Sequence, residues 1–174
     1  MNQTNHTTIL LKPVSRRLTS KAAPSSDRWL QLAVRALARS DRTTAQIERL
    51  LEMKGASQSQ VRSAVRRLTS LRYLDDAAFA ARWADRRLAR MPMGRVRLQE
   101  ELLATGCPEH IVQAALQATY RKVNERDLAR QVVMLAGQAS SMRTHDRLMR
   151  LLSQRGFDEE TIETVMGPLM RDRN

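Results

Sequence analysis

Apolar residues recur in one pattern around three glycines of this chain, Gly55, Gly106 and Gly156, which stand 51 and 50 residues apart. In each copy they lie eight and four positions before the glycine and six and ten positions after it. They are Ile47, Leu51, Val61 and Val65, then Leu98, Leu102, Val112 and Leu116, then Leu148, Leu152, Ile162 and Met166. Such spacing is typical of two amphipathic helices on either side of a glycine. The sequence therefore predicts three copies of a helical unit of about 50 residues.

Helix-start signals agree with this division. Asp27 is the expected N-cap of a first helix that carries Trp29, and a second helix runs from Thr43 or Thr44 to Gly55. Short polar side chains at these positions accept hydrogen bonds from unpaired amides of the first turn, and a glycine adopts the left-handed conformation that ends a helix. A further helix is expected in each unit before the two helices that flank the glycine, from Trp29 to Leu37, from Phe79 to Leu88 and from Leu128 to Leu135.

The helix after each glycine has a start signal of its own. Ser57 is followed three residues later by Gln60, which is a capping-box pattern, and the helix carries apolar residues as far as Leu71. Pro108 is expected in the first turn of the corresponding helix of the second copy, and Asp158 marks the start of the third.

These signals predict an all-α fold of three tandem three-helix repeats, at residues 28–74, 75–119 and 120–170. Repeats that contact mainly their neighbours form an elongated body, which can be curved. Aromatic residues make up only 3% of the chain, so the core must consist mainly of Leu, Ala, Val, Ile and Met, which favours helices over sheets.

Residues 1–27 read as a disordered basic tail, because Pro13, Pro24 and many polar residues leave little apolar surface to bury. Cys107 is the only cysteine, which favours a reducing compartment. No apolar run approaches the length of about 20 residues that spans a membrane. A cytoplasmic protein without a membrane partner is expected.

Positive charge is concentrated in the middle of the chain. Residues 1–27 carry a net charge of +3, residues 28–97 carry +10 and residues 98–174 carry −1, within a total of +12. Chance bias among solvated helices remains an alternative, but a segment this basic favours a partner with negative charge.

Arginines are the candidate binding residues, because the guanidinium fork matches phosphates and carboxylates. Arg82, Arg86 and Arg90 recur every four residues and form one edge of a helix beside Phe79 and Trp83. The spacing of these two aromatic residues favours the core over base stacking. The full candidate set for protein or DNA binding is Arg62, Arg66, Arg67, Arg82, Arg86, Arg87, Arg90, Arg95 and Arg97.

Signals for catalysis are missing from the sequence, so no enzyme, cofactor or metal site is predicted. A phosphate-binding loop, a zinc-protease motif and a serine nucleophile elbow are all absent. Cys107 and His110 have a metal-like spacing, but a buried thiol beside a surface imidazole is the simpler interpretation. Glu100 and Glu101 point in different directions on a helix, and Arg97, four residues before Glu101, is the expected ion-pair partner.

The runs RYLDDAAFAARWADRR and GRVRLQEELLATG closely resemble the centre of the RecX family of bacterial regulatory proteins. ALARSDRTTAQIERLLEMKG and VRSAVRRLTSLRYL resemble that family's N-terminal repeat, so the resemblance covers about residues 28–167. It implies a monomeric protein that lies in the groove of the RecA recombinase filament. Such a protein inhibits ATPase, strand-exchange and co-protease activities in recombination and the SOS response. Two features depart from the family pattern, the basic tail and Cys107 in place of an aliphatic residue.

The resemblance also implies binding to single-stranded DNA, with double-stranded DNA as an option, without sequence preference. On this hypothesis the arginines of the first two units contact the filament and DNA, while the third unit supplies neutral contacts. Two alternatives stay open. A three-helix unit ending in SAVRRLTSLRYLDD also resembles a helix-turn-helix transcriptional regulator, which would bind specific duplex sequences. The other alternative is a protein-interaction scaffold without DNA contacts.

Overall fold

In the computed structural model, which describes residues 26–139 and 145–171, these residues form α-helices and no strands. This confirms the predicted all-α fold. The helices are α1 (Ser26–Arg39), α2 (Thr44–Met53), α3 (Gln58–Ser70), α4 (Asp76–Arg90), α5 (Arg95–Ala104), α6 (Glu109–Lys122), α7 (Glu125–Ala139), α8 (His145–Gln154) and α9 (Glu159–Arg171). The predicted tail lies outside the described residues, except that Ser26 and Asp27 belong to α1. No helix in the described ranges is long and apolar enough to cross a membrane.

Capping side chains stabilise the first turns of α2 and α3. Thr43 caps α2, because its hydroxyl accepts a hydrogen bond from the Gln46 amide at 3.2 Å. The Gln46 side chain accepts one in return from the Thr43 amide at 3.3 Å, which completes a capping box. Ser57 and Gln60 form the same box at the start of α3, as predicted.

The three repeat glycines lie in the left-handed region, with φ of 89° at Gly55, 86° at Gly106 and 77° at Gly156. Gly55 follows the end of α2, Gly106 that of α5 and Gly156 that of α8. The predicted role of Gly55 as a helix terminator is confirmed. Residues with a β-carbon rarely adopt this backbone conformation, which explains why glycine recurs at this position.

Three details of the sequence-based prediction were wrong. Asp27 lies inside the first turn of α1 and is not its N-cap. Pro108 occupies the N-cap position of α6, one residue earlier than expected. Leu71 is 45% exposed, because it lies at the C-cap of α3, beyond the last turn that faces the core.

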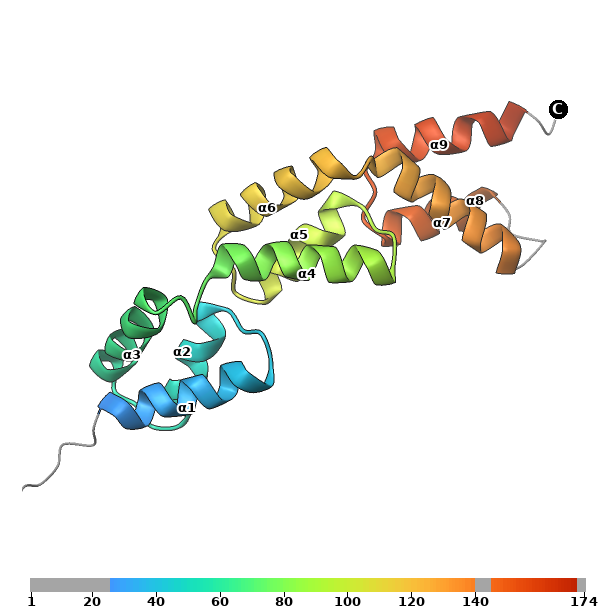
Figure 1. Ribbon diagram of the computed structural model, residues 1–174. Coiled ribbons are helices and arrows are strands. Elements are labelled where there is room, and N and C mark those ends of the chain that lie inside the picture. The colour runs from blue at the N-terminus through green and yellow to red at the C-terminus, as the bar shows by residue number, and fades with distance from the viewer. Residues whose placement is uncertain (1–25, 140–144, 172–174) are drawn as a thin grey trace, which may run out of the picture.

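Buried side chains gather in three clusters within the described residues. The N-terminal cluster joins α1, α2 and α3 around Trp29, Ile47 and Leu68. The middle cluster joins α4, α5 and α6, and the C-terminal cluster joins α7, α8 and α9. In each group the first and third helices pack closely against each other. The groups follow one another in an elongated row (Figure 1). The predicted boundaries at residues 28–74, 75–119 and 120–170, and the repeat count, stay predictions.

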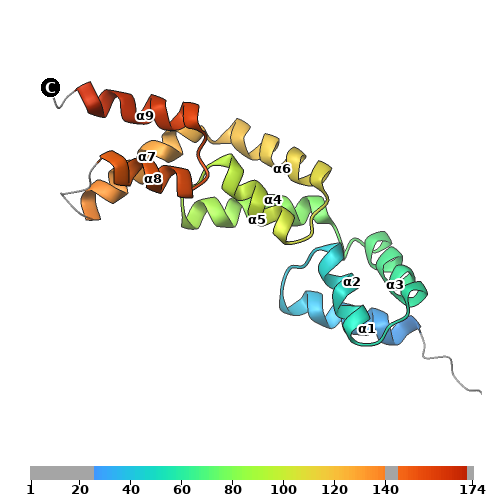
Figure 2. The same ribbon diagram turned by 180° about the vertical axis from the view of Figure 1, so that it is seen from behind.

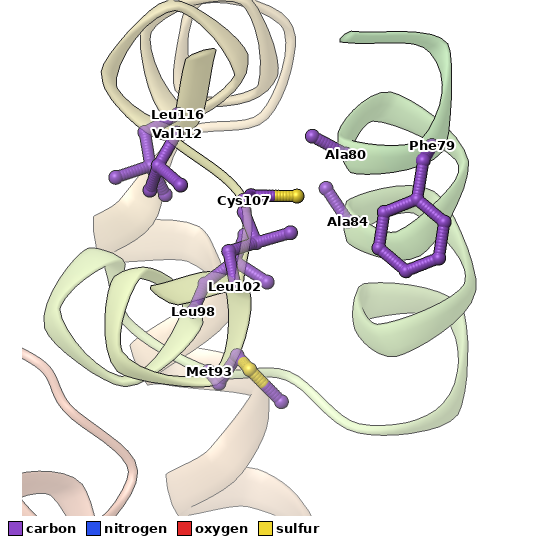
Figure 3. Close-up of a cluster of buried hydrophobic side chains, with 9 residues drawn as sticks. All are labelled: Phe79, Ala80, Ala84, Met93, Leu98, Leu102, Cys107, Val112 and Leu116. Atoms are coloured by element: carbon purple, nitrogen blue, oxygen red, sulfur yellow. The ribbon is translucent and has the colours of Figure 1, made fainter. Parts of the chain in front are cut away.

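The middle cluster fixes α4 against α5 and α6 (Figure 3). The Cys107 side chain points from the turn before α6 toward Ala80 and Ala84 of α4, and it is 4% exposed. Burial raises the pKa of its thiol, so this cysteine stays protonated and contributes to packing. The predicted buried thiol is confirmed.

Neighbouring groups meet where a helix N-cap of one group touches the glycine turn of the next. The Thr43 hydroxyl donates to the carbonyl of Thr105, the residue before Gly106, at 2.8 Å. The Gly94 amide likewise donates to the carbonyl of Arg155, the residue before Gly156, at 2.9 Å. We call these contacts the first joint and the second joint. Figure 2 shows the α1–α3 and α7–α9 groups from behind, at the two ends of the α4–α6 group.

Candidate functional site

The arginines of α3 have no ionic partner among the described side chains. Arg62, Arg66 and Arg67 are exposed, and none of them forms an ion pair within the part of the chain that the structure describes. They lie on the side of α3 away from the buried residues Val61, Ala64 and Leu68. These arginines can therefore bind an anionic partner without breaking an internal contact.

Two arginines of α4 converge on one carboxylate from the loop between α1 and α2. Arg82 donates two hydrogen bonds to Asp41, at 2.9 Å and 2.8 Å, and Arg86 approaches Asp41 at 3.6 Å. The Arg82 hydrogen bonds hold the pKa of Asp41 below its usual range, although burial opposes the shift. Arg82 thus links α4 to the α1–α3 group, and its charge is largely used inside the molecule.

Glu101 on α5 holds two further candidates. Arg87 donates to its carboxylate at 2.6 Å and 2.7 Å, and the Arg97 Nε donates at 3.3 Å. The expected pair of Arg97 with Glu101 is confirmed, and Arg97 also approaches Glu100 at 3.9 Å. The Arg87 hydrogen bonds lower the pKa of Glu101, although burial opposes the shift. Arg87 therefore fastens α4 to α5.

Arg95 lies at the second joint. Its amide donates to Glu125 at 2.7 Å, and its guanidinium approaches the same carboxylate at 3.8 Å. The guanidinium also lies 5.0 Å from the centre of the Tyr120 ring, and the Tyr120 hydroxyl donates to the Met93 carbonyl at 3.1 Å. Burial raises the pKa of Glu125 and that of Tyr120. These contacts place Arg95 in the connection between the middle and C-terminal groups.

Arg90 completes the candidate set at the end of α4. It is exposed and has no ion pair among the described side chains. With Trp83, Arg86, Arg87 and Glu101 it lines a groove of about 340 Å³ on the surface of the middle group. The structure thus brings Arg86, Arg87 and Arg90 together, whereas the α3 arginines and Arg95 belong to other parts of the surface.

The two aromatic residues beside this edge are stacked on each other. The Phe79 and Trp83 rings have centroids 5.6 Å apart and planes 26° apart. Phe79 is 1% exposed, which confirms its predicted place in the core. Trp83 is half-buried and forms part of the groove wall, so the core prediction is correct for it only in part.

Metal chemistry has no support in the described ranges, where no three His, Cys, Asp or Glu side chains are gathered closely enough to hold an ion. Cys107 is buried, whereas His110 is exposed on α6. The arginines and the groove can bind anions. The candidates without an ionic partner in the part of the chain that the structure describes are Arg62, Arg66, Arg67 and Arg90.

Comparisons with known proteins agree on one family. A family model described as "RecX, second three-helix domain" matches residues 75–116, from the N-cap of α4 to the middle of α6. Among solved structures, the crystal structure of RecX from Lactobacillus salivarius has a TM-score of 0.75 at 16% sequence identity. It covers 83% of this chain and 96% of that chain, and at this identity it supports the fold alone.

Sequence relatives extend the match over most of the chain. The regulatory protein RecX of Chlorobaculum tepidum is 33% identical over 137 residues, which cover 78% of this chain and 85% of the relative. That of Mycobacterium leprae is 31% identical over 165 residues, which cover 89% of this chain and 96% of the relative. The chain therefore belongs to the RecX family of regulatory proteins.

Proposed function

We propose that this protein binds the RecA recombinase filament and inhibits its ATPase, strand-exchange and co-protease activities in recombination and the SOS response. Membership of a family of regulatory proteins supports a regulatory role, and RecA is the partner that this family implies. The observation that carries the proposal is the elongated row of helix groups (Figure 1), together with exposed arginines that form no ion pair among the described side chains. An elongated body offers contacts to more than one subunit of an assembly.

The mechanism follows from where the charges lie. Arg62, Arg66 and Arg67 on α3 and Arg90 on α4 contact acidic filament surface or DNA phosphates, while the neutral C-terminal group touches a neighbouring subunit. A body that bridges subunits resists the rearrangements that ATP turnover requires, because any movement between subunits must break contacts at one end. The protein acts as a binding protein and not as an enzyme, and it works as a monomer in the cytoplasm.

DNA binding is the second component of the proposal. Exposed arginines bind phosphates without reading base sequence, so affinity for single-stranded DNA depends strongly on salt and weakly on sequence. Tight binding to one duplex sequence, together with loss of the salt dependence, would favour the transcriptional-regulator alternative.

ATP hydrolysis by RecA on single-stranded DNA tests the proposal directly. The protein is added at substoichiometric and then at equimolar amounts, with filaments verified by sedimentation. Inhibition well below one molecule per RecA subunit supports bridging or blocked filament growth. No inhibition at an equimolar amount contradicts it.

The charge contribution is tested with a variant in which Arg62, Arg66, Arg67 and Arg90 are replaced by Gln. These side chains make no internal ion pairs in the described part of the chain, so the fold should persist. We expect the variant to inhibit RecA at least tenfold less effectively, which corresponds to about 1.4 kcal/mol of lost binding free energy. Wild-type inhibition by a folded variant would contradict the assignment of these arginines.

A further inference from the structure

The side chains around the α4–α5 groove form one continuous patch. Trp83, Arg86, Arg87 and Arg90 are three or four residues apart along α4, so they project from one face of that helix. Glu101 from α5 lines the groove opposite them, and the enclosed volume is about 340 Å³. The groove therefore combines an aromatic wall with guanidinium groups in one place.

Positive charge in the groove exceeds what its own carboxylate neutralises. Glu101 engages Arg87 through two short hydrogen bonds, of 2.6 Å and 2.7 Å. Arg86 reaches the more distant Asp41 only at 3.6 Å, and Arg90 has no ionic partner among the described side chains. Arg86 and Arg90 are four residues apart, about 6 Å along the helix axis, so both can reach one phosphate.

The indole of Trp83 is held in place and is not covered by a cation. Phe79 stacks on it from the core side, with ring centroids 5.6 Å apart. Within the described residues, guanidinium groups cover the rings of Trp29 and Tyr120, but none lies over Trp83. The Trp83 Nε1 is shielded from solvent without a hydrogen-bond partner in the described residues. Protein atoms cover this nitrogen, so the indole contributes to binding through the ring surface that lines the groove.

We propose that this groove binds one unpaired nucleotide of a single-stranded nucleic acid, with its base against Trp83 and its phosphate between Arg86 and Arg90. The inference rests on the DNA binding proposed above and adds a site and a type of contact to it. An acidic peptide could use the two arginines, but it offers no flat surface for the indole. An unpaired nucleotide uses both, and any base fits because every base has a π-face. Paired bases in a duplex are already stacked and cannot enter.

Tryptophan fluorescence can report on this site alone. The chain has two tryptophans, and Trp29 is buried in the N-terminal cluster, so Trp29→Phe leaves Trp83 as the only indole. This variant is titrated with a short oligothymidylate and with an abasic oligonucleotide of the same length, while anisotropy of a labelled strand measures binding. We expect saturable quenching by oligothymidylate at the midpoint of the anisotropy curve, and weaker binding without quenching by the abasic strand.

Two results of this titration would overturn the inference. Binding of oligothymidylate without any change in Trp83 fluorescence would mean that nucleic acid binds elsewhere. Equal quenching by the abasic strand, or by a glutamate-rich peptide that displaces the oligonucleotide, would mean that the groove recognises negative charge and not a base.

Point variants separate the groove from the general charge of the protein. Arg90→Ala, and Trp83→Leu with its fold verified by circular dichroism, are each expected to weaken oligothymidylate binding about tenfold. Arg121→Ala removes an exposed arginine of α6 outside the groove, and we expect a change of about twofold at most. Equal effects of Arg90→Ala and Arg121→Ala would contradict a specific site.

The same variants are assayed for inhibition of RecA. If Trp83→Leu and Arg90→Ala bind oligothymidylate more weakly but still inhibit RecA, the nucleotide site stands and is dispensable for regulation. If the wild-type protein shows the expected quenching but no inhibition of RecA, the proposed function fails and the nucleotide site remains.

Discussion

Glu101 satisfies two arginines at once, which makes it the most connected carboxylate of the middle group. Its side chain is 16% exposed, and it accepts two hydrogen bonds from Arg87 and one from Arg97. A lysine could not replace Arg87 here, because an ammonium group lacks the planar fork that matches both carboxylate oxygens. The candidate arginines therefore divide into those that hold the fold together and those that face solvent without a partner.

Replacing Glu101 with Gln tests the structural role of this carboxylate. Arg87 would keep part of its hydrogen bonding but lose the opposite charge, so we expect the free energy of unfolding to fall by about 1–3 kcal/mol at neutral pH. Arg87 lowers the pKa of Glu101 in the folded state, so the carboxylate stabilises the protein above its unfolded pKa. The difference between wild type and variant should therefore shrink as pH falls through the folded pKa of Glu101. Urea unfolding over a pH series measures it.

Glu100→Gln is the matched control, because the neighbouring carboxylate is 64% exposed and approaches Arg97 only at 3.9 Å. We expect no measurable change in stability from it. An equal loss in both variants would show that the effect comes from net charge and not from the Arg87 contact.

Only some of these ion pairs can be predicted from the sequence. Arg97 and Glu101 are four residues apart on one helix, so helical geometry alone brings them together. Arg87 and Glu101 lie 14 residues apart on different helices, and Arg82 and Asp41 lie 41 residues apart. Their pairing depends on how α4 packs against α5 and against the first group. The regular spacing of Arg82, Arg86 and Arg90 suggested a single binding edge, although Arg82 is already engaged by Asp41.

Helix caps show how an element can serve both local and long-range structure. Thr43 and Ser57 each form a capping box with a glutamine three residues later. Thr43 is fully buried, and its hydroxyl also donates to the Thr105 carbonyl across the first joint. Ser57 is exposed and makes no such contact in the described chain. The capping box of Ser57 therefore stabilises its own helix only, whereas that of Thr43 also contributes to the contact between two helix groups.

Alanine at these two caps should separate the two contributions. Ser57→Ala removes a cap only, and we expect a loss of about 1 kcal/mol in the free energy of unfolding. Thr43→Ala removes a cap and leaves the buried Thr105 carbonyl without its donor, so about 2 kcal/mol is expected. Thr43→Ser keeps the hydroxyl and should recover most of the loss. Equal losses for Thr43→Ala and Ser57→Ala, measured by urea unfolding, would contradict a role of Thr43 in the joint.

The second joint depends on the absence of a side chain at Gly94. A β-carbon there would lie 2.1 Å from the Gly156 carbonyl oxygen, which is backbone and cannot move aside easily. Gly94→Ala is therefore expected to destabilise the protein by about 1–3 kcal/mol, through overpacking between the middle and C-terminal groups. Thermal unfolding measures the loss of stability, and hydrogen exchange of the α5 and α8 amides shows where in the structure it occurs.

Gly137→Ala is the matched control for Gly94→Ala. Gly137 lies inside α7, and a β-carbon there would meet nothing within 4 Å. Alanine is the better helix former, so this change should raise stability by about 0.5–1 kcal/mol. A loss at Gly137 comparable to that at Gly94 would show that the clash at the joint is not the cause.

Periodicity predicts the helices well but says little about how they meet. The turns at Gly55, Gly106 and Gly156 and the starts of α2 and α3 follow from local chemistry, and the sequence was sufficient for them. The backbone contact of Gly94 with Gly156, 62 residues away, depends on how the groups pack and does not follow from the local sequence. Leu71 fitted the apolar period of α3, but the helix ends before that position can reach the core.

At the scale of the whole molecule, the two joints differ in chemistry. Leu88 and Tyr120 pack against both the middle and the C-terminal clusters, so apolar packing is continuous across the second joint. The first joint has no such shared residue among the described clusters. It is held by polar contacts of Thr43, Thr44 and Asp41. The helices α4–α9 should therefore move as one body, with any adjustment to a partner at the first joint.

The salt dependence of DNA binding should reveal which arginines face a partner. Each phosphate contact in single-stranded DNA contributes about 0.7 to the slope of log affinity against log salt. Replacing Arg62, Arg66 and Arg67 with Gln should therefore reduce the slope by about 2, with little change in stability, because these side chains have no ionic partner in the described chain. Replacing Arg82, Arg87 and Arg97 removes the same charge, but these arginines are held by Asp41 and Glu101, so stability should fall while the slope changes little. Equal slope changes in two folded triple variants would mean that total charge, and not the internal pairing of arginines, determines how this protein binds DNA.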